Sequence, residues 1–308
     1  MTVNVKNMIR KKQTNRFFLR FTEKAAPVFF LLCAAISVLT TVGIILTLFV
    51  ETITFFNKVS FIEFITGTQW WPFGRNPSYG ILPLVSGTML ITIIASAVAL
   101  PIGLASAIYL SEFAGERTRK VVKPVLEVLA GIPTIVYGFF ALTFVTPVLE
   151  MIIPDLPVFN ALSPGIVVGV MIIPMIASLS EDALHSVPIS MREGALAIGS
   201  TRLEMAMKVV VPSALSGIIS SFVLGISRAI GETMIVAVAA GATPKLTWDV
   251  TESIQTMTGY IVQVSLGDVS YGSTAYYSIY AVGMTLFVFT LIMNIISHYI
   301  SRRFKEDY

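Results

Sequence analysis

The sequence predicts an all-α integral membrane protein with six transmembrane helices and both termini in the cytoplasm. Its 308 residues are 55% hydrophobic and 13% charged, with a mean hydropathy of +0.81. Soluble domains of this length do not show such a composition. A helix needs about 20 apolar residues to cross a hydrocarbon layer of roughly 30 Å. Six apolar runs reach that length: residues 25–50, 82–110, 128–149, 156–180, 213–241 and 276–300.

Positive charge sets the expected orientation of these spans, because loops rich in Lys and Arg stay in the cytoplasm. Most of the 21 Lys and Arg residues lie in residues 1–24, in the second and fourth connections, or at the C-terminus. The opposite side holds Lys58, Arg75 and Lys245. We therefore expect a basic cytoplasmic tail at residues 1–24, and a transmembrane domain at residues 25–308 with both ends in the cytoplasm.

The fourth connection, residues 181–212, carries helix signals of its own. Ser190 followed by Glu193 fits a capping box, in which the hydroxyl and the carboxylate each satisfy a backbone donor. Gly199 stands where such a helix would stop. The pattern predicts a short helix over residues 191–198.

A second capping box, Thr201 with Glu204, predicts another helix that runs to Val211. A short ordered helix that projects from the bilayer can dock in a groove of another protein and pass movement to it. The alternative is a surface helix that only connects two spans.

A family resemblance rests on residues of this connection. They follow the spacing of the EAA loop (E-A-A, three residues, G, nine residues, I-x-L-P) at Glu193, Gly194, Ala195, Gly199, Val209, Val211 and Pro212. Gly194, Val209 and Val211 depart from that pattern by mild changes. The chain therefore resembles the permease subunits of ABC importers. The resemblance implies a type I importer permease fold with a cytoplasmic coupling helix in residues 181–212.

Within that family the chain is similar to the phosphate-specific permeases of the PstC type. The segments that carry the likeness are GILPLVSGTMLIT (residues 80–92), GIPTIVYG (131–138) and SRAIGETM (227–234). The sister PstA type shares the Arg-x-x-x-Glu element and stays an alternative. A permease for another oxyanion, such as sulfate or molybdate, and a non-transporting scaffold or regulatory subunit are the others.

The resemblance implies inorganic phosphate as the substrate and the cytoplasmic membrane of a bacterium or archaeon as the location. It also implies three partners: a second permease in a heterodimer, a dimeric ATP-binding subunit on the cytoplasmic side, and an extracytoplasmic phosphate-binding protein. The residues expected to couple to the ATP-binding subunit are Ser190, Arg192, Glu193, Gly194, Ala195 and Gly199.

The sequence shows no arrangement of residues suited to catalysis or to metal binding. It lacks the G-x-x-x-x-G-K-[ST] phosphate loop of ATPases. His185 and His298 lie near the ends of different spans, and Cys33 is the single cysteine. We expect a transport subunit that is not an enzyme, with no cofactor, no metal and no nucleic-acid partner.

Arg228 and Glu232 form a charge pair inside the apolar run SFVLGISRAIGETMIVAVAAG, residues 221–241. Near mid-bilayer a charged residue costs roughly 2.5–3.5 kcal/mol, so it must face the bundle interior, a partner or water. A spacing of four places the two side chains on one helical face.

The pair is either an internal staple or part of the substrate pathway, where the guanidinium fork would bind phosphate oxygens. In the second case Glu232 has two possible duties. It holds Arg228 until phosphate arrives, or it accepts a hydrogen bond from the proton that phosphate carries and sulfate lacks, and so repels sulfate.

Small residues recur at every fourth position of the same run. They are Ser213, Gly217, Ser221, Gly225, Ala229 and Thr233. Such a stripe lets membrane helices pack closely. We expect this helix to line the contact with the second permease.

Overall fold

The computed structural model describes the backbone of residues 5–303 and the side chains of residues 23, 25–296 and 299. Residues 1–4 and 304–308 lie outside the described residues, as do the Lys and Arg side chains of the expected basic tail and of the C-terminus. The protein is mostly helical, as predicted. Its elements are α1 (Val5–Phe56), α2 (Phe61–Thr66), β1 (Trp70–Trp71), β2 (Ser78–Tyr79), α3 (Leu82–Ile108), η1 (Tyr109–Phe113), α4 (Glu116–Ala130), α5 (Thr134–Phe140), η2 (Ala141–Val145), α6 (Thr146–Glu150), α7 (Leu162–His185), α8 (Ile189–Ala197), α9 (Arg202–Met205), η3 (Ala206–Val210), α10 (Val211–Ser213), α11 (Leu215–Ile230), α12 (Met234–Ala239), α13 (Met257–Leu266) and α14 (Thr274–Arg303).

The chain divides into two units, Met1–Glu51 and Thr52–Tyr308. The first unit consists of most of α1, whose side chains from residue 25 to residue 50 are nearly all exposed and largely apolar. The helix is continuous through residue 24, so the backbone shows no break at the predicted edge of the basic tail.

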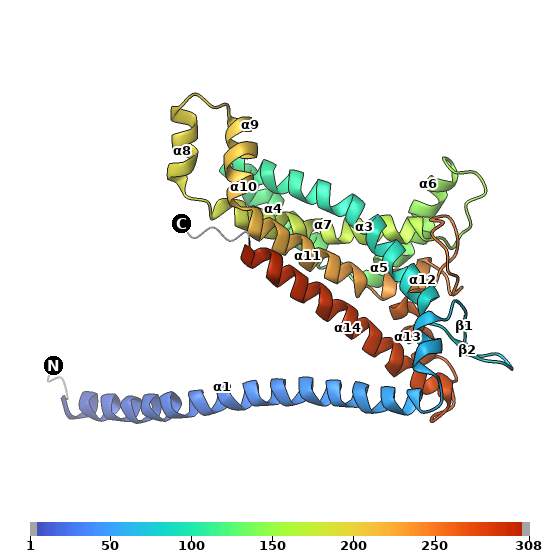
Figure 1. The fold of residues 1–308 in the computed structure, drawn as a ribbon. Helices are drawn as coiled ribbons and strands as arrows, with labels where there is room; N and C mark the ends of the chain where they lie inside the picture. Colours follow the sequence, from blue (N-terminus) through green and yellow to red (C-terminus); the bar gives the residue numbers. More distant parts are fainter. Residues whose placement is uncertain (1–4, 304–308) are drawn as a thin grey trace. The chain divides into compact units, whose positions relative to one another are not determined.

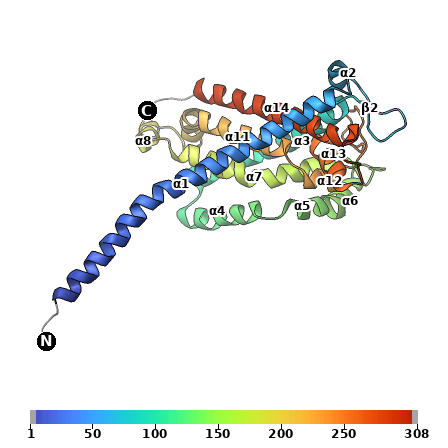
Figure 2. The same ribbon diagram turned by 90° about the horizontal axis from the view of Figure 1, so that it is seen from below.

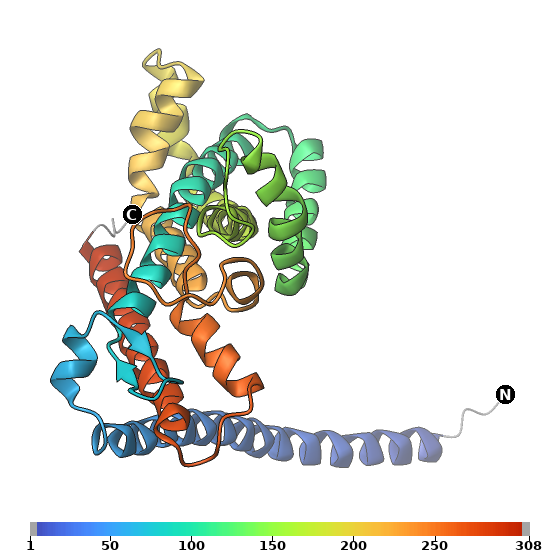
Figure 3. The same cartoon turned by 90° about the vertical axis from the view of Figure 1, so that its right-hand side faces the viewer.

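In the second unit, α7 is the central helix. The helices α3, α4, α5 and α11 all pack on it, and Figure 3 looks along it with these neighbours around it. Figure 2 shows α4 and α5 following one another along one side of α7. The apolar core lies among α3, α7 and α12. In Figure 1 the helices α8 and α9 stand at one end of this unit, and the antiparallel pair β1–β2 lies at the other. We call these the α8 end and the hairpin end.

Four helices are long and apolar enough to cross a membrane: Ala25–Phe56, Leu82–Phe113, Leu162–His185 and Thr274–Ile296. Two further pairs of helices qualify only as bent pairs. The described residues therefore contain four to six candidate spans, and six result if each bent pair counts as one. The predicted runs at 82–110 and 276–300 agree well with α3 and α14.

The third predicted run, 128–149, is not one helix. The helix α4 ends at Ala130, and the chain turns by 87° before the segment Thr134–Glu150. Gly131 caps α4, and Pro133 precedes α5 with an extended backbone. Pro has no N–H to continue a helix, so the helix breaks here. The run stays apolar across this point, and hydropathy alone therefore did not predict the break.

The fifth predicted run, 213–241, is also broken. Its main helix, α11, begins at Leu215 after a bend of 73° and ends at Ile230, where Gly231 is the C-cap. The chain then restarts as the six-residue helix α12. The expectation of one continuous span through residue 241 was wrong.

The small-residue stripe packs against α7 of the same chain. A Cβ on Gly217 would lie 2.5 Å from the Ala183 Cβ, and one on Gly225 would lie 2.8 Å from the Ile176 side chain. Between them the Ser221 hydroxyl lies 2.6 Å from that of Ser180. The stripe therefore brings α11 and α7 together at Gly217, Ser221 and Gly225. The expectation that this helix lines the contact with a second permease stays a prediction.

Candidate functional site

Arg228 and Glu232 meet across the break that follows α11. The Arg228 Nη1 donates to the Glu232 Oε2 at 2.7 Å. The Glu232 side chain is 2% exposed and that of Arg228 is 43% exposed. The predicted pairing is confirmed, but its predicted geometry was wrong. Because α11 ends at Ile230, the two residues share no helical face.

The second carboxylate oxygen of Glu232 satisfies the start of α12. Its Oε1 accepts from the backbone N–H groups of Met234 at 3.1 Å and Ile235 at 3.3 Å. These donors have no partner inside the helix, so a carboxylate at this position stabilises the first turn. The backbone carbonyl of Glu232 in turn accepts from the Thr258 hydroxyl at 2.7 Å. Glu232 thus fixes the helix break and Arg228 together.

The guanidinium of Arg228 borders a cavity of about 460 Å³ between α4, α5 and α7. Its Nη2 lies 3.8 Å from the Met171 sulfur. The lining is largely apolar, and among the described residues that form it Arg228 is the only cation and Glu127 the only carboxylate. The half-exposed guanidinium of Arg228 therefore lies beside this cavity. A cavity with one cation in its wall can receive a small anion.

The helix of the fourth connection is α8, Ile189–Ala197, and not residues 191–198. Its N-cap is Pro188, and no side chain caps it, so the expected capping box of Ser190 and Glu193 does not form. The fixed φ of Pro188 (−57°) sets the chain for a helix that begins before Ser190. Ser190 therefore lies inside the helix.

The predicted stop at Gly199 is confirmed. Gly199 has a φ of +94°, a conformation that favours glycine. Its N–H donates to the Leu196 carbonyl at 3.0 Å, and the Ser200 N–H donates to the Ala195 carbonyl at 3.2 Å. This pair of bonds is the Schellman motif that closes helix C-termini.

The residues expected to couple to an ATP-binding subunit divide into two sets. Ser190, Glu193, Gly194 and Gly199 are exposed. A Cβ on Gly194 or Gly199 would meet nothing within 4 Å, so both positions border open space in the described chain. By contrast, Ala195 is buried and Arg192 turns inward, toward the rest of the unit.

The second capping box is confirmed. The Thr201 hydroxyl accepts from the Glu204 N–H at 3.2 Å, and the Glu204 carboxylate accepts from the Thr201 N–H at 3.1 Å. The hydrogen bonds that the Glu204 carboxylate accepts from the Thr201 N–H, from Lys208 and from the Thr201 hydroxyl lower the pKa of Glu204 to about 2. The helix continues through η3 and α10 to Ser213, slightly beyond the predicted end.

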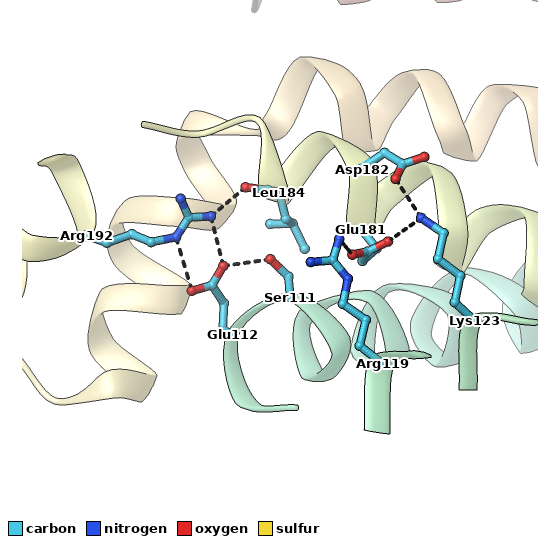
Figure 4. Close-up of polar contacts among 8 residues, drawn as sticks. All are labelled: Ser111, Glu112, Arg119, Lys123, Glu181, Asp182, Leu184 and Arg192. Carbon is cyan, nitrogen blue, oxygen red and sulfur yellow. Dashed lines mark hydrogen bonds and ion pairs between the residues drawn. The ribbon is translucent and has the colours of Figure 1, made fainter. Parts of the chain in front are cut away.

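Sequence reasoning missed a cluster of ion pairs at the α8 end. It consists of Glu112, Arg119, Lys123, Glu181, Asp182 and Arg192 (Figure 4). A signal was present, since two carboxylates directly follow the apolar run of α7 and a basic segment follows that of α3. The basic residues served only as a guide to orientation, and their partners could not be assigned from spacing.

Comparisons with known proteins agree with this architecture. Residues 99–306 match the family of binding-protein-dependent transport system inner membrane components. A probable ABC transporter permease of Bacillus subtilis, YqgH, is 37% identical over 275 residues, which cover 89% of each chain. The phosphate transport system permease PstC 1 of Mycobacterium tuberculosis is 32% identical over 281 residues, or 80% of this chain and 83% of that one.

Two solved structures share the fold. A chain of a bacterial alginate ABC transporter aligns with a TM-score of 0.62 at 16% identity, covering 96% of this chain and 98% of that one. A chain of the methionine transporter MetNI aligns with a TM-score of 0.54 at 17% identity, covering 74% and 95%. Fold, apolar helices and relatives define an ABC transporter permease subunit of the cytoplasmic membrane. The chain belongs to the binding-protein-dependent transport system inner membrane component family.

Proposed function

We propose that the chain is the PstC-type permease of an ATP-driven importer of inorganic phosphate. It forms the translocation path with a sister permease, crosses the membrane six times, and keeps both termini and the fourth connection in the cytoplasm. The observation that carries the proposal is the guanidinium of Arg228 at a cavity inside the unit. Relatives named for phosphate transport support the choice of anion.

The chemistry of Arg228 suits a phosphate. A guanidinium presents a planar fork that matches two phosphate oxygens and stays charged in any protein environment. In the structure Glu232 binds one nitrogen of this fork, Nη1, and both its oxygens already accept hydrogen bonds within the chain. This supports the first of its two duties, in which the carboxylate holds Arg228 until phosphate displaces it.

The exposed side of α8 suits a partner protein. Ile189, Leu196 and Ile198 are exposed there beside Glu193. An apolar group with one charge on a short projecting helix fits a groove of another protein. We assign this surface to a dimeric ATP-binding subunit. Its ATP cycle would shift the permease between two states, one of which accepts phosphate from an extracytoplasmic binding protein.

The test is ATP-driven phosphate uptake by vesicles that contain this chain, a sister permease, the ATP-binding subunit and the binding protein. Arg228→Ala should abolish uptake while the complex still assembles. Lys120→Ala is the matched control, because it removes an exposed cation whose only described ion pair is with exposed Glu116. Unchanged uptake by Arg228→Ala would remove Arg228 from the substrate pathway. Uptake of sulfate or molybdate in place of phosphate by the unsubstituted protein would establish that the chain is a permease for another oxyanion.

Glu232→Gln separates the two duties of the carboxylate. If Glu232 selects for the proton of phosphate, this variant should gain sulfate uptake, since its amide no longer repels a fully ionised anion. Loss of phosphate uptake with no gain of sulfate would refute that selectivity role and leave the holding role.

A further inference from the structure

The guanidinium of Arg192 joins α8 to two other elements. Its Nε and Nη2 donate to the two carboxylate oxygens of Glu112 at 3.3 and 3.1 Å. Nη2 also donates to the Leu184 carbonyl at 2.7 Å, and Nη1 donates to the Val187 carbonyl. The side chain is only 16% exposed and that of Glu112 only 4%. Such a shielded, multiply bonded pair is held far more firmly than a surface ion pair.

The acceptors come from the ends of two membrane helices. Glu112 lies in η1, the wider turn that ends the α3 segment, and the Ser111 hydroxyl donates to it at 2.7 Å. Leu184 lies in the last turn of α7, and Val187 follows that helix. Carbonyls at a helix C-terminus lack partners within the helix and carry partial negative charge, so they attract a cation. Figure 4 shows Arg192 reaching these acceptors from α8.

A second group of ion pairs ties the same turn of α7 to α4. Glu181 is 1% exposed, accepts from Lys123 at 2.9 Å and forms an ion pair with Arg119. Lys123 also donates to Asp182 at 2.9 Å. The last turn of α7 is therefore fixed to α4 on one side and, through Arg192, to α8 and η1 on the other (Figure 4).

We propose that Arg192 is the positioning residue that transmits displacement of α8 to the membrane helices. This inference rests on the proposed function. A pull on α8 reaches the last turn of α7 through the Leu184 carbonyl and reaches the α3 segment through Glu112. The helix α7 extends from there to Met171, the contact of Arg228, a distance of about 20 Å at a rise of 1.5 Å per residue. Arg192 thus acts on the substrate path through α7 and touches no substrate itself.

The joint requires arginine and not merely a positive charge. Arg192 uses three of its nitrogens to reach a carboxylate and two carbonyls at once. A lysine carries one nitrogen and cannot span these acceptors in a fixed plane. Arg192→Lys therefore keeps the charge that neutralises Glu112 and loses the rigid connection.

The experiment measures ATP hydrolysed per phosphate imported in vesicles that hold the complete transporter. For Arg192→Lys we expect normal assembly with the ATP-binding subunit, retained ATP hydrolysis, and a rise of at least about fivefold in this ratio, the lower end of typical coupling between sites. Lys120→Ala, which breaks an exposed ion pair, should leave the ratio unchanged. An unchanged ratio in Arg192→Lys, whether uptake and hydrolysis both persist or both fall in proportion, would overturn the proposal.

A double-substitution cycle tests the named partner. Glu112→Gln keeps the shape of the acceptor and weakens only the connection to the α3 segment, so it should raise the ratio less than Arg192→Lys does, and it replaces that variant if the latter does not assemble. The two substitutions together should have no more effect than Arg192→Lys alone, because that variant already breaks the contact with Glu112. Additive effects would overturn the pairing as the transmitting contact. If the unsubstituted transporter imports no phosphate, the proposed function is wrong. This outcome is distinct from an unchanged ratio in Arg192→Lys, which overturns only the role of Arg192.

Discussion

The substitution Glu232→Gln isolates the free energy of the ion pair between buried Glu232 and half-exposed Arg228 from that of the helix cap. In this variant the glutamine Oε1 can still accept from the N–H groups of Met234 and Ile235. Its amide NH2 group replaces the carboxylate oxygen that, in the unsubstituted protein, lies 2.7 Å from the Arg228 Nη1. A hydrogen bond to a charged group contributes about 1.5–3 kcal/mol when shielded. Because Arg228 is 43% exposed and water can replace its partner, we expect Glu232→Gln to lower the free energy of unfolding by only about 1 kcal/mol. Glu232→Ala loses the cap as well, about 0.5–2 kcal/mol more.

The measurement is the free energy of unfolding of the purified chain in mixed detergent micelles. Glu116→Gln is the control, since that carboxylate is 90% exposed and should contribute almost nothing. Equal losses in Glu232→Gln and Glu232→Ala would show that the cap on α12 has no energetic value. A loss above about 3 kcal/mol in Glu232→Gln would show that the pair is shielded from water, contrary to the exposure of Arg228.

Two further predictions concern packing and pH. Gly217→Val should lower the free energy of unfolding by about 1–3 kcal/mol, because its Cβ would lie 2.5 Å from that of Ala183. The control Gly43→Val should not lower it, since a Cβ there would meet nothing within 4 Å. Equal effects of the two substitutions would refute the close contact of α11 with α7. The depressed pKa of Glu204, about 2, means that its capping contribution is present above the ordinary value of 4.5 and is lost as pH falls through 2. Hydrogen exchange, corrected for intrinsic rates, should show protection of the Thr201 amide falling over that interval, and Glu204→Gln should abolish this pH dependence.

Hydropathy predicted the helices that need only length and apolar content. The runs at 82–110 and 276–300 correspond to α3 and α14 because no residue in them stops the helix, Pro101 being tolerated inside α3. The runs at 128–149 and 213–241 failed because a scan of apolar content does not register where the backbone breaks. The ten-residue helix α13 was missed for the opposite reason, since it is too short to register as a span.

The contacts of the candidate site were likewise predicted only in part. The pairing of Arg228 with Glu232 could be predicted because the two residues are close in sequence and share an apolar run. Arg192 was expected to couple to an ATP-binding subunit, which stays a prediction, and its contact with Glu112, 80 residues away in sequence, was not predicted. Only the meeting of η1, α7 and α8 in space reveals that partner. Local spacing predicts local contacts, and long-range ion pairs depend on the fold.

The contacts that the sequence did not predict converge on α7. Arg192 binds its last turn, Arg228 contacts Met171 along its length, and the small residues of α11 pack against it from Ile176 to Ala183. Because Gly217 and Gly225 leave no room between the two helices, α7 cannot shift sideways without moving α11, which carries Arg228. Packed interfaces of this kind move as units and do not deform continuously. In the proposed transmission from Arg192, the contact of these small residues with α7 carries a displacement at the α8 end on to α11 and its guanidinium.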